Sequence, residues 1–196
     1  MYCNIILYTF FLGFLSFANC GINTFSKNNL RRLKETPATI QEIDLSKYLG
    51  NWYQIYGSPT NVIFQGYGKC ITANYGLLEN EYISVLNSQL NSKNELEQIS
   101  GYAYFKNYSE PGKLTVHLDG TPVDAPYWIV KLGEVKDQQY QYSIITTPSG
   151  VSLWVLTRDI DTFFLYYDKE VREFLDYYQF KYDSIKQDET CVYSKY

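Results

Sequence analysis

The pattern that most constrains the fold is a series of short aromatic and β-branched runs, separated by turn residues at intervals of roughly 8 to 15 residues. The fifth run alternates strictly, with Leu114, Val116 and Leu118 on one face and His117 on the other. Such runs predict an all-β domain, and His117 is expected to point outward. The eight predicted strands are residues 52–57, 69–78, 82–89, 98–106, 113–118, 127–132, 140–147 and 151–157.

One helix is predicted after the last strand, at about residues 161–179. Asp161 is a suitable N-cap, and apolar residues recur at helical spacing from Phe164 to Tyr178. The eighth strand is apolar on both faces, as expected if the helix covers its outer side. Eight strands and a late helix predict a closed, antiparallel up-and-down barrel, with the helix packed on the outside and an interior wide enough for a small ligand.

The first residues of the chain differ in composition from the rest. Residues 5–18 are apolar but shorter than the ~20 residues that span a bilayer, so residues 1–20 are predicted to be a cleaved signal peptide. A membrane anchor is the alternative. Residues 21–42 are predicted to form a flexible basic arm, and 43–196 the folded domain. The expected location is outside the cell or in a secretory or vacuolar lumen.

Two cysteines remain once the signal is removed, Cys70 and Cys191. In an oxidising compartment they are expected to form one disulfide that tethers the C-terminal tail, the alternative being two free thiols. Asn107, in Asn107-Tyr108-Ser109, is a predicted N-glycosylation site.

The residue inventory favours binding over catalysis. The chain has 21 Tyr, 11 Phe and 3 Trp but a single His and a single Met, and its net charge of −4 makes nucleic acid a poor partner. No cluster of His or Cys suggests a metal, and no glycine-rich loop suggests a phosphate. We therefore expect a protein that is not an enzyme and that uses no cofactor or metal.

Several motifs together resemble one family. Leu49-Gly50-Asn51-Trp52 resembles the Gly-x-Trp signature of lipocalins, and Leu156-Thr157-Arg158 resembles the arginine motif after their last strand. From about residue 43 to residue 191 the chain is similar to the apolipoprotein D-like group, which includes bacterial outer-membrane lipocalins. The segments that carry this resemblance are 68–80, 85–87, 100–103, 111–116 and 125–130.

The resemblance implies roles for particular residues. Gly50, Trp52 and Arg158 are expected to close the floor of the barrel, where the guanidinium lies over the indole. Cys70 is expected to pair with Cys191, as in the family. The cup is expected to bind a small hydrophobic molecule such as a fatty acid, sterol, retinoid or tetrapyrrole. The expected lining residues are Ala73, Tyr75, Leu114, Val116, Leu118, Tyr127, Ile129, Tyr142, Trp154 and Leu156, with Ile144 beside Tyr142.

Two alternatives stay open. The aromatic side chains could fill the barrel, leaving no cavity. The protein could then be an interaction scaffold, in which the 57–68 loop or the tyrosine-rich helix contacts a membrane surface or a second copy. The same loop is equally suited to cover the cup as a lid. If the protein were an enzyme, de-epoxidase-type lipocalin chemistry would be the least implausible activity.

Overall fold

The computed structural model describes residues 35–188 and 191. The predicted signal peptide and residues 21–34 of the predicted arm lie outside the described residues. No helix in the described part of the chain is long and apolar enough to span a membrane.

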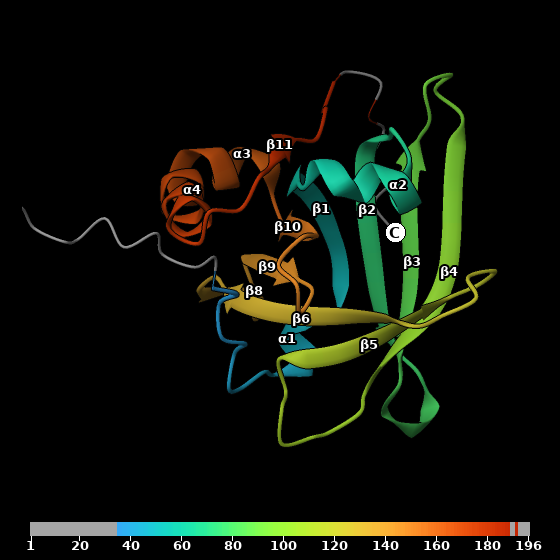
Figure 1. Cartoon of the computed structure of the whole chain (residues 1–196), viewed down its shortest axis with the longest axis vertical. Coiled ribbons are helices and arrows are strands. Elements are labelled where there is room, and N and C mark those ends of the chain that lie inside the picture. The colour runs from blue at the N-terminus through green and yellow to red at the C-terminus, as the bar shows by residue number, and fades with distance from the viewer. Residues whose placement is uncertain (1–34, 189–190, 192–196) are drawn as a thin grey trace, which may run out of the picture. The chain divides into compact units, whose positions relative to one another are not determined.

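Eight antiparallel strands close into a barrel, as predicted from the sequence (Figure 1). Neighbouring strands in the chain pair with one another, and β10 pairs back onto β1 to complete the wall. The barrel is therefore of the up-and-down type. Its strands are β1 (Gly50–Gly57), β2 (Lys69–Leu77), β3 (Ile83–Leu90), β4 (Leu96–Phe105), β5 (Lys113–Leu118), β6 (Ala125–Leu132), β9 (Tyr142–Thr146) and β10 (Leu153–Thr157).

The predicted seventh strand is divided in two. Its first residue, Tyr140, belongs to β8 (Gln139–Tyr140), which pairs with β7 (Val135–Lys136) in a separate hairpin, and only β9 belongs to the barrel wall. This division determines which residues of β9 face the interior.

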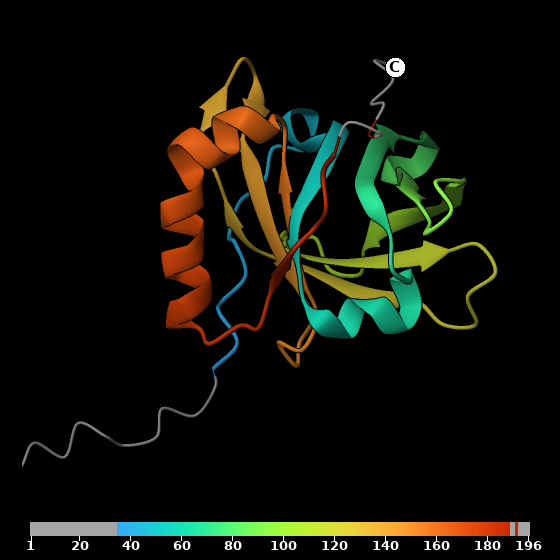
Figure 2. The ribbon, with the colours of Figure 1, turned by 90° about the horizontal axis from the view of Figure 1, so that it is seen from above.

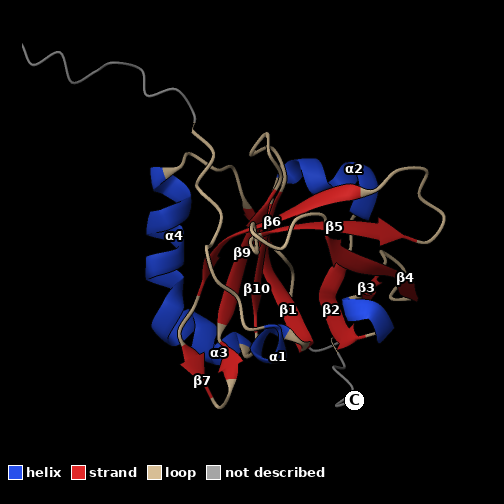
Figure 3. Cartoon of the chain, turned by 90° about the horizontal axis from the view of Figure 1, so that it is seen from below, coloured by secondary structure: helices blue, strands red, loops and turns tan. Residues whose placement is uncertain are grey.

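The helical segment after the barrel packs on its outer surface, as Figure 3 shows for α4. It consists of α3 (Ile160–Thr162), a π-helical turn labelled η3 (Phe163–Tyr167) and α4 (Asp168–Tyr177). The N-cap is Asp159, whose carboxylate accepts a hydrogen bond from the Thr162 amide, so the prediction of Asp161 was wrong. The helix stops before the predicted residue 179. Its apolar face includes Phe163, Val171 and Leu175, which are fully buried against the wall.

The two ends of the barrel are built differently. One end, here called the floor, carries α1 (Leu45–Tyr48) and the β2–β3 turn with η2 (Glu79–Glu81). The other end, here called the mouth, carries η1 (Pro59–Asn61) and α2 (Val62–Gln65) between β1 and β2, together with the β3–β4 turn. Figure 1 shows α2 and the β3–β4 turn at the same end of the barrel.

The last residues of the predicted arm contact the barrel. The Ile40 amide donates to the Ile129 carbonyl at 3.0 Å, and the Thr36 hydroxyl donates to the Pro148 carbonyl. A Cβ on Gly112 would come within 2.7 Å of the Ile40 carbonyl oxygen, so the segment lies directly against the β4–β5 turn. Residues 36–40 therefore belong to the folded domain, and the flexible arm was extended too far toward residue 42.

The C-terminal tail completes the wall between β1 and β2 at the mouth (Figure 2). The β1–β2 ladder ends at the Tyr53–Thr72 pair. Beyond it, β11 (Asp183–Ser184) pairs with β1, the Ile185 amide donates to the Ile55 carbonyl, and the Cys70 amide donates to the Lys186 carbonyl. The tail is therefore hydrogen-bonded to both strands.

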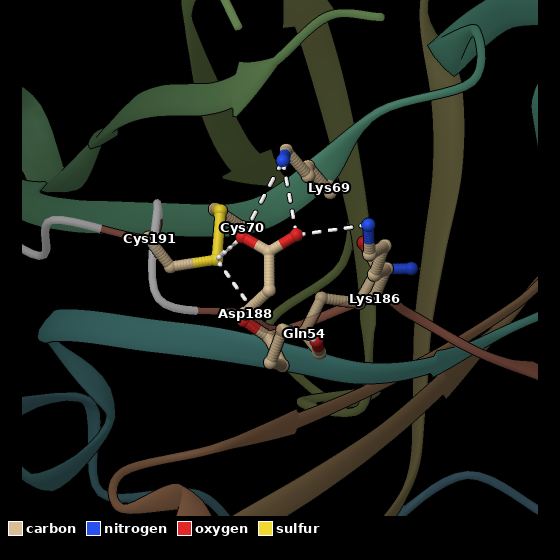
Figure 4. The surroundings of a disulfide bond; sticks show 7 residues. Gln54, Lys69, Cys70, Lys186, Asp188 and Cys191 are labelled. Carbon is tan, nitrogen blue, oxygen red and sulfur yellow. Dashed lines mark hydrogen bonds and ion pairs between the residues drawn. A yellow bond between two sulfur atoms is a disulfide. The ribbon is translucent and has the colours of Figure 1, made fainter.

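A disulfide between Cys70 and Cys191 holds this tail, as the sequence predicted (Figure 4). The Asp188 carboxylate lies beside it and pairs with Lys69 at 3.0 Å and Lys186 at 2.9 Å. Cys70, Asp188 and Cys191 lie within 4.8 Å of one another, but the two sulfurs are bonded and cannot act as thiolate metal ligands.

A candidate ligand-binding cup

The barrel wall separates two hydrophobic clusters, one inside the barrel and one beneath the helix. Nine of the ten predicted lining residues belong to the inner cluster or pack against it. These nine are Ala73, Tyr75, Leu114, Val116, Leu118, Tyr127, Ile129, Trp154 and Leu156. Period-two alternation of the strands accounts for this common orientation.

Tyr142 is the exception, and its assignment to the cup was wrong. It belongs to the cluster under the helix together with Ile144, and its hydroxyl donates to the Glu170 carboxylate at 2.7 Å. Directly paired residues share a face of the sheet, and Leu156 pairs with Ser143. The interior residues of β9 are therefore Ser143 and Ile145, one position away from the predicted ones.

Trp52 and Arg158 close the floor as predicted. Trp52 is 0% exposed, and the guanidinium carbon of Arg158 lies 3.6 Å from the centroid of its ring. Such a cation–π contact contributes about 0.5–2 kcal/mol. The indole N–H also donates to the Tyr48 carbonyl at 2.8 Å, which ties the floor to α1.

Arg158 also binds the C-terminal end of α1 through backbone carbonyls. Its guanidinium donates to the carbonyls of Lys47, Tyr48, Leu49 and Asn51 at 2.6–3.1 Å. A cation is favoured there because the last carbonyls of a helix lack partners within it. Gly50 adopts φ +94°, which favours glycine, and a Cβ there would lie 3.4 Å from the guanidinium.

A hydrogen-bonded set of phenols lies just above the floor. The Tyr127 hydroxyl contacts the hydroxyls of Tyr48 at 2.7 Å and Tyr75 at 3.1 Å, and Tyr48 also contacts the Ser143 hydroxyl at 3.0 Å. Burial raises the pKa of Tyr48 to about 12 and raises the pKa values of Tyr75 and Tyr127 further. Burial likewise lowers the pKa of Arg158 to about 10. The phenols are therefore neutral groups that bind one another.

The mouth is lined by amides that the sequence analysis missed. Gln65 of α2 reaches two interior side chains: its Oε1 accepts from the Trp154 indole at 3.2 Å, and its Nε2 donates to Gln54 Oε1 at 3.0 Å. Gln54 pairs with Leu156 and shares its inward face. These bonds join α2, here called the lid, to β10 and β1 at the mouth.

Gln89 of β3 connects the lid to the opposite side of the mouth. Its Nε2 donates to the Gln65 carbonyl at 2.8 Å and to the Glu97 carboxylate at 3.0 Å. Its Oε1 is buried and has no hydrogen-bond partner. Gln89 stands at even spacing from the inward residues Ile83 and Val85, a signal that could have placed it on the inner face.

Several side chains of the inner wall retain contact with solvent. Val116, Leu118 and Trp154 point into the barrel yet are only partly buried, whereas Trp52 and Ile129 on the same wall are fully buried. These inward-facing side chains of β5 and β10 are therefore less buried than the side chains at the floor.

The exterior of the barrel carries a separate groove and the single histidine. The groove has a volume of about 550 Å³ and lies between the helical segment and the β6–β9 connection, lined by Leu132, Glu134, Lys136, Tyr142, Thr162, Tyr166, Tyr167 and Glu170.

His117 stacks on Tyr102 outside the barrel and contacts the Asp124 carboxylate at 2.9 Å. The outward orientation predicted for His117 is confirmed, so it does not enter the cup.

Comparison with known proteins gives the family. A lipocalin-like domain matches residues 43–164, and the chain belongs to this family. Rat apolipoprotein D is 44% identical over 95 residues, 48% of this chain and 49% of that protein. The outer membrane lipoprotein Blc of Vibrio cholerae is 30% identical over 132 residues, 67% of this chain and 74% of that protein. The match thus spans about half the length of the apolipoprotein D relative and more of the bacterial protein.

Solved structures share the fold at low sequence identity. The cockroach allergen Per a 4 has a TM-score of 0.54 at 20% identity and covers 79% of this chain and 94% of its own. Apocrustacyanin C2 has a TM-score of 0.55 at 16% identity and covers 79% of this chain and 92% of its own. At these identities the likeness establishes the fold alone, in agreement with the closed barrel.

Proposed function

We propose that this lipocalin binds a small hydrophobic molecule in the cup and carries or sequesters it. The candidate ligand classes are fatty acids, sterols, retinoids and tetrapyrroles. Lipocalins bind small hydrophobic ligands, and the described residues offer an apolar inner wall with a polar mouth. The observation that carries the proposal is the partial exposure of inward-facing Val116, Leu118 and Trp154 above a sealed floor.

Quenching of tryptophan fluorescence tests this proposal. The folded protein is titrated with retinol, cholesterol, a fatty acid and biliverdin, in parallel with Trp154→Phe. Saturable quenching that this variant loses supports a ligand in the cup. Trp128→Phe is the matched control, because Trp128 contacts Lys113 on the outer face. Absence of a saturable response to every ligand would reject the proposal.

The proposed location is outside the cell or in a secretory or vacuolar lumen. The Cys70–Cys191 disulfide supports an oxidising compartment. Asn107 stays a predicted glycosylation site, and it lies exposed between β4 and β5. Expression in a secreting eukaryotic cell, followed by N-terminal sequencing and endoglycosidase treatment, tests signal cleavage and glycosylation together.

A second function, a docking scaffold, is favoured by one observation. The segment between β1 and β2 exposes Ile63 at 84% and Tyr67 at 85%, and the π-helical turn exposes Phe164, Leu165 and Tyr166. Exposed apolar groups of this kind mark contacts with a membrane surface or a second copy. Sedimentation velocity at two concentrations, with and without lipid vesicles, tests it. A protein that stays monomeric and leaves vesicles unbound would exclude this function.

A further inference from the structure

We infer that the cup selects a lipid with a neutral, hydrogen-bond-donating head, such as an alcohol, over the carboxylate with the same chain. This inference rests on the proposed function and specifies the head group that the mouth accepts. Four observations on the described residues carry it: the use of donors at the mouth, a buried acceptor there without a partner, the placement of cations on the wall, and the charge of the rim.

The Trp154 and Gln89 donors at the mouth already have acceptors. The Trp154 indole N–H donates to Gln65 Oε1, and Gln65 Nε2 donates to Gln54 Oε1. Gln89 Nε2 donates to both the Gln65 carbonyl and Glu97. An entering carboxylate can only accept hydrogen bonds, so at Trp154 and Gln89 it would have to displace one of these contacts.

An acceptor, by contrast, is left over. Gln89 Oε1 is buried without a partner, and it lies so close to Gly68 that a Cβ there would come within 2.1 Å of it. A buried acceptor without a partner is unfavourable, because it has lost its hydrogen bonds to water without gaining a replacement. A ligand hydroxyl that reaches it as α2 shifts would supply the missing donor, whereas a carboxylate would place a second acceptor beside it.

The positive charges of the described wall lie outside the cup. Lys69, Lys113 and Lys131 are paired with Asp188, Glu110 and Glu170 respectively. Arg158 is held under the floor by Trp52 and the carbonyls of α1. A buried carboxylate without a cation is strongly unfavourable, so an anionic head would keep its charge near the mouth.

At the mouth itself the described charges are mainly negative. The β3–β4 turn and the strand that follows carry Glu95 and Glu97 against Lys93, and Asp119 begins the β5–β6 connection. On the opposite side of the mouth, Lys69 and Lys186 are both paired with Asp188. Hydrogen bonds from Gln89 and Asn91 lower the pKa of Glu97, which keeps its carboxylate charged at neutral pH. A ligand carboxylate would meet like charge there.

Three heads on one chain test the inference: hexadecanol, methyl hexadecanoate and hexadecanoic acid, titrated by tryptophan quenching at pH 7.5 below their aggregation concentrations. We expect the alcohol to bind at least about tenfold more tightly than the acid, equivalent to about 1.4 kcal/mol. The ester, which is neutral but cannot donate, is expected between them. An acid that binds as tightly as the alcohol would overturn the inference while leaving the proposed function intact. Failure of all three to bind would count against the proposed function itself.

Two variants locate the selection at the mouth. Glu97→Gln is expected to reduce the ratio of alcohol affinity to acid affinity severalfold, because it removes the negative charge that contacts Gln89. Glu79→Gln makes the same change in an exposed turn at the floor and should leave the ratio unchanged. Gln89→Met should weaken binding of the alcohol and leave the affinity for the ester unchanged. If Glu97→Gln, Glu79→Gln and the unchanged protein have the same ratio of alcohol affinity to acid affinity, the charge of the rim does not contribute to the selection.

Discussion

The floor and the mouth of the barrel use similar side chains in opposite ways. Each end has a tryptophan on the inner wall, Trp52 at the floor and Trp154 at the mouth. Trp52 is fully buried, stacks on Arg158 and donates to the Tyr48 backbone, whereas Trp154 is half-buried and donates to a side-chain amide on the lid. A hydrogen bond to the backbone of the barrel floor holds the Trp52 side chain in place. The partner of Trp154 is a side chain on a short helix, and it can move when that helix moves. The kind of partner thus distinguishes the two tryptophans, backbone and guanidinium for Trp52 and a side-chain amide of α2 for Trp154.

The largest effect that separates the two ends is expected from truncating each tryptophan. Trp52→Ala should lower the free energy of unfolding by about 3–5 kcal/mol, because it leaves a cavity in the sealed floor. Trp154→Ala should cost about 1–2 kcal/mol, since its side chain already meets solvent. Urea unfolding monitored by circular dichroism measures both. Equal losses would mean that the mouth is packed as tightly as the floor.

The disulfide stabilises the mouth end of the wall, and its removal should have the next largest effect. The double variant Cys70→Ser/Cys191→Ser frees a loop with a sequence separation of 121 residues, and we expect a loss of about 2–4 kcal/mol. The single variants serve as controls, because either one alone already breaks the bond. A double variant as stable as the oxidised protein would show that the tail's hydrogen bonds suffice to hold it.

Alkaline pH should destabilise the floor, where buried phenols titrate. The pKa of Tyr48 is raised to about 12 in the fold from an ordinary 10.0, so the unfolded chain loses this proton first. The contribution of this group to the free energy of unfolding is fully present below pH 10 and is lost as the pH rises toward 12. The free energy of unfolding falls by at most about 1.4 kcal/mol per pH unit for each such phenol. Unfolding titrations between pH 9 and 12 measure the slope, which Tyr48→Phe should reduce. An unchanged slope would exclude Tyr48 as a contributor.

The smallest expected change in stability comes from a residue on the outer face of the barrel wall, and it tests whether that face takes part in ligand binding. Tyr142→Phe removes the hydroxyl that donates to Glu170 and should cost about 1 kcal/mol. Ligand affinity should not change, because Tyr142 lies under the helix. Fluorescence titration beside urea unfolding tests this. A loss of ligand affinity equal to that of Trp154→Phe would show that Tyr142 contributes to the binding site after all.

The features of the fold that rest on pattern and chemistry were predictable from the sequence. Alternating apolar residues gave the strands, the motifs gave Trp52 and Arg158, and two cysteines gave the disulfide. The orientation of Tyr142 was not predictable in the same way. The β6–β9 register shifts between Ile129 and Lys131, and Gln139–Tyr140 leaves the wall for a hairpin, so counting by twos fails there.

The polar mouth was missed for a different reason. Apolar or aromatic character predicts interior positions of a barrel, and Gln54, Gln65 and Gln89 have neither. The role of Gln65 depends on where α2 folds across the end of the barrel, which involves contacts with β1, β3 and β10. Such long-range contacts leave no local pattern in the sequence. Gln89, which follows the alternation of β3, could have been found.

The bond between Cys70 and Cys191 also determines what limited proteolysis can release. A protease that nicks any turn between β2 and the tail leaves both fragments joined through sulfur, so they migrate as one species on a non-reducing denaturing gel. A nick between β1 and β2 lies before Cys70 and frees the N-terminal piece under the same conditions. Comparing gels with and without reductant therefore reports whether the segment over the cup is cut, and whether a bound ligand protects it.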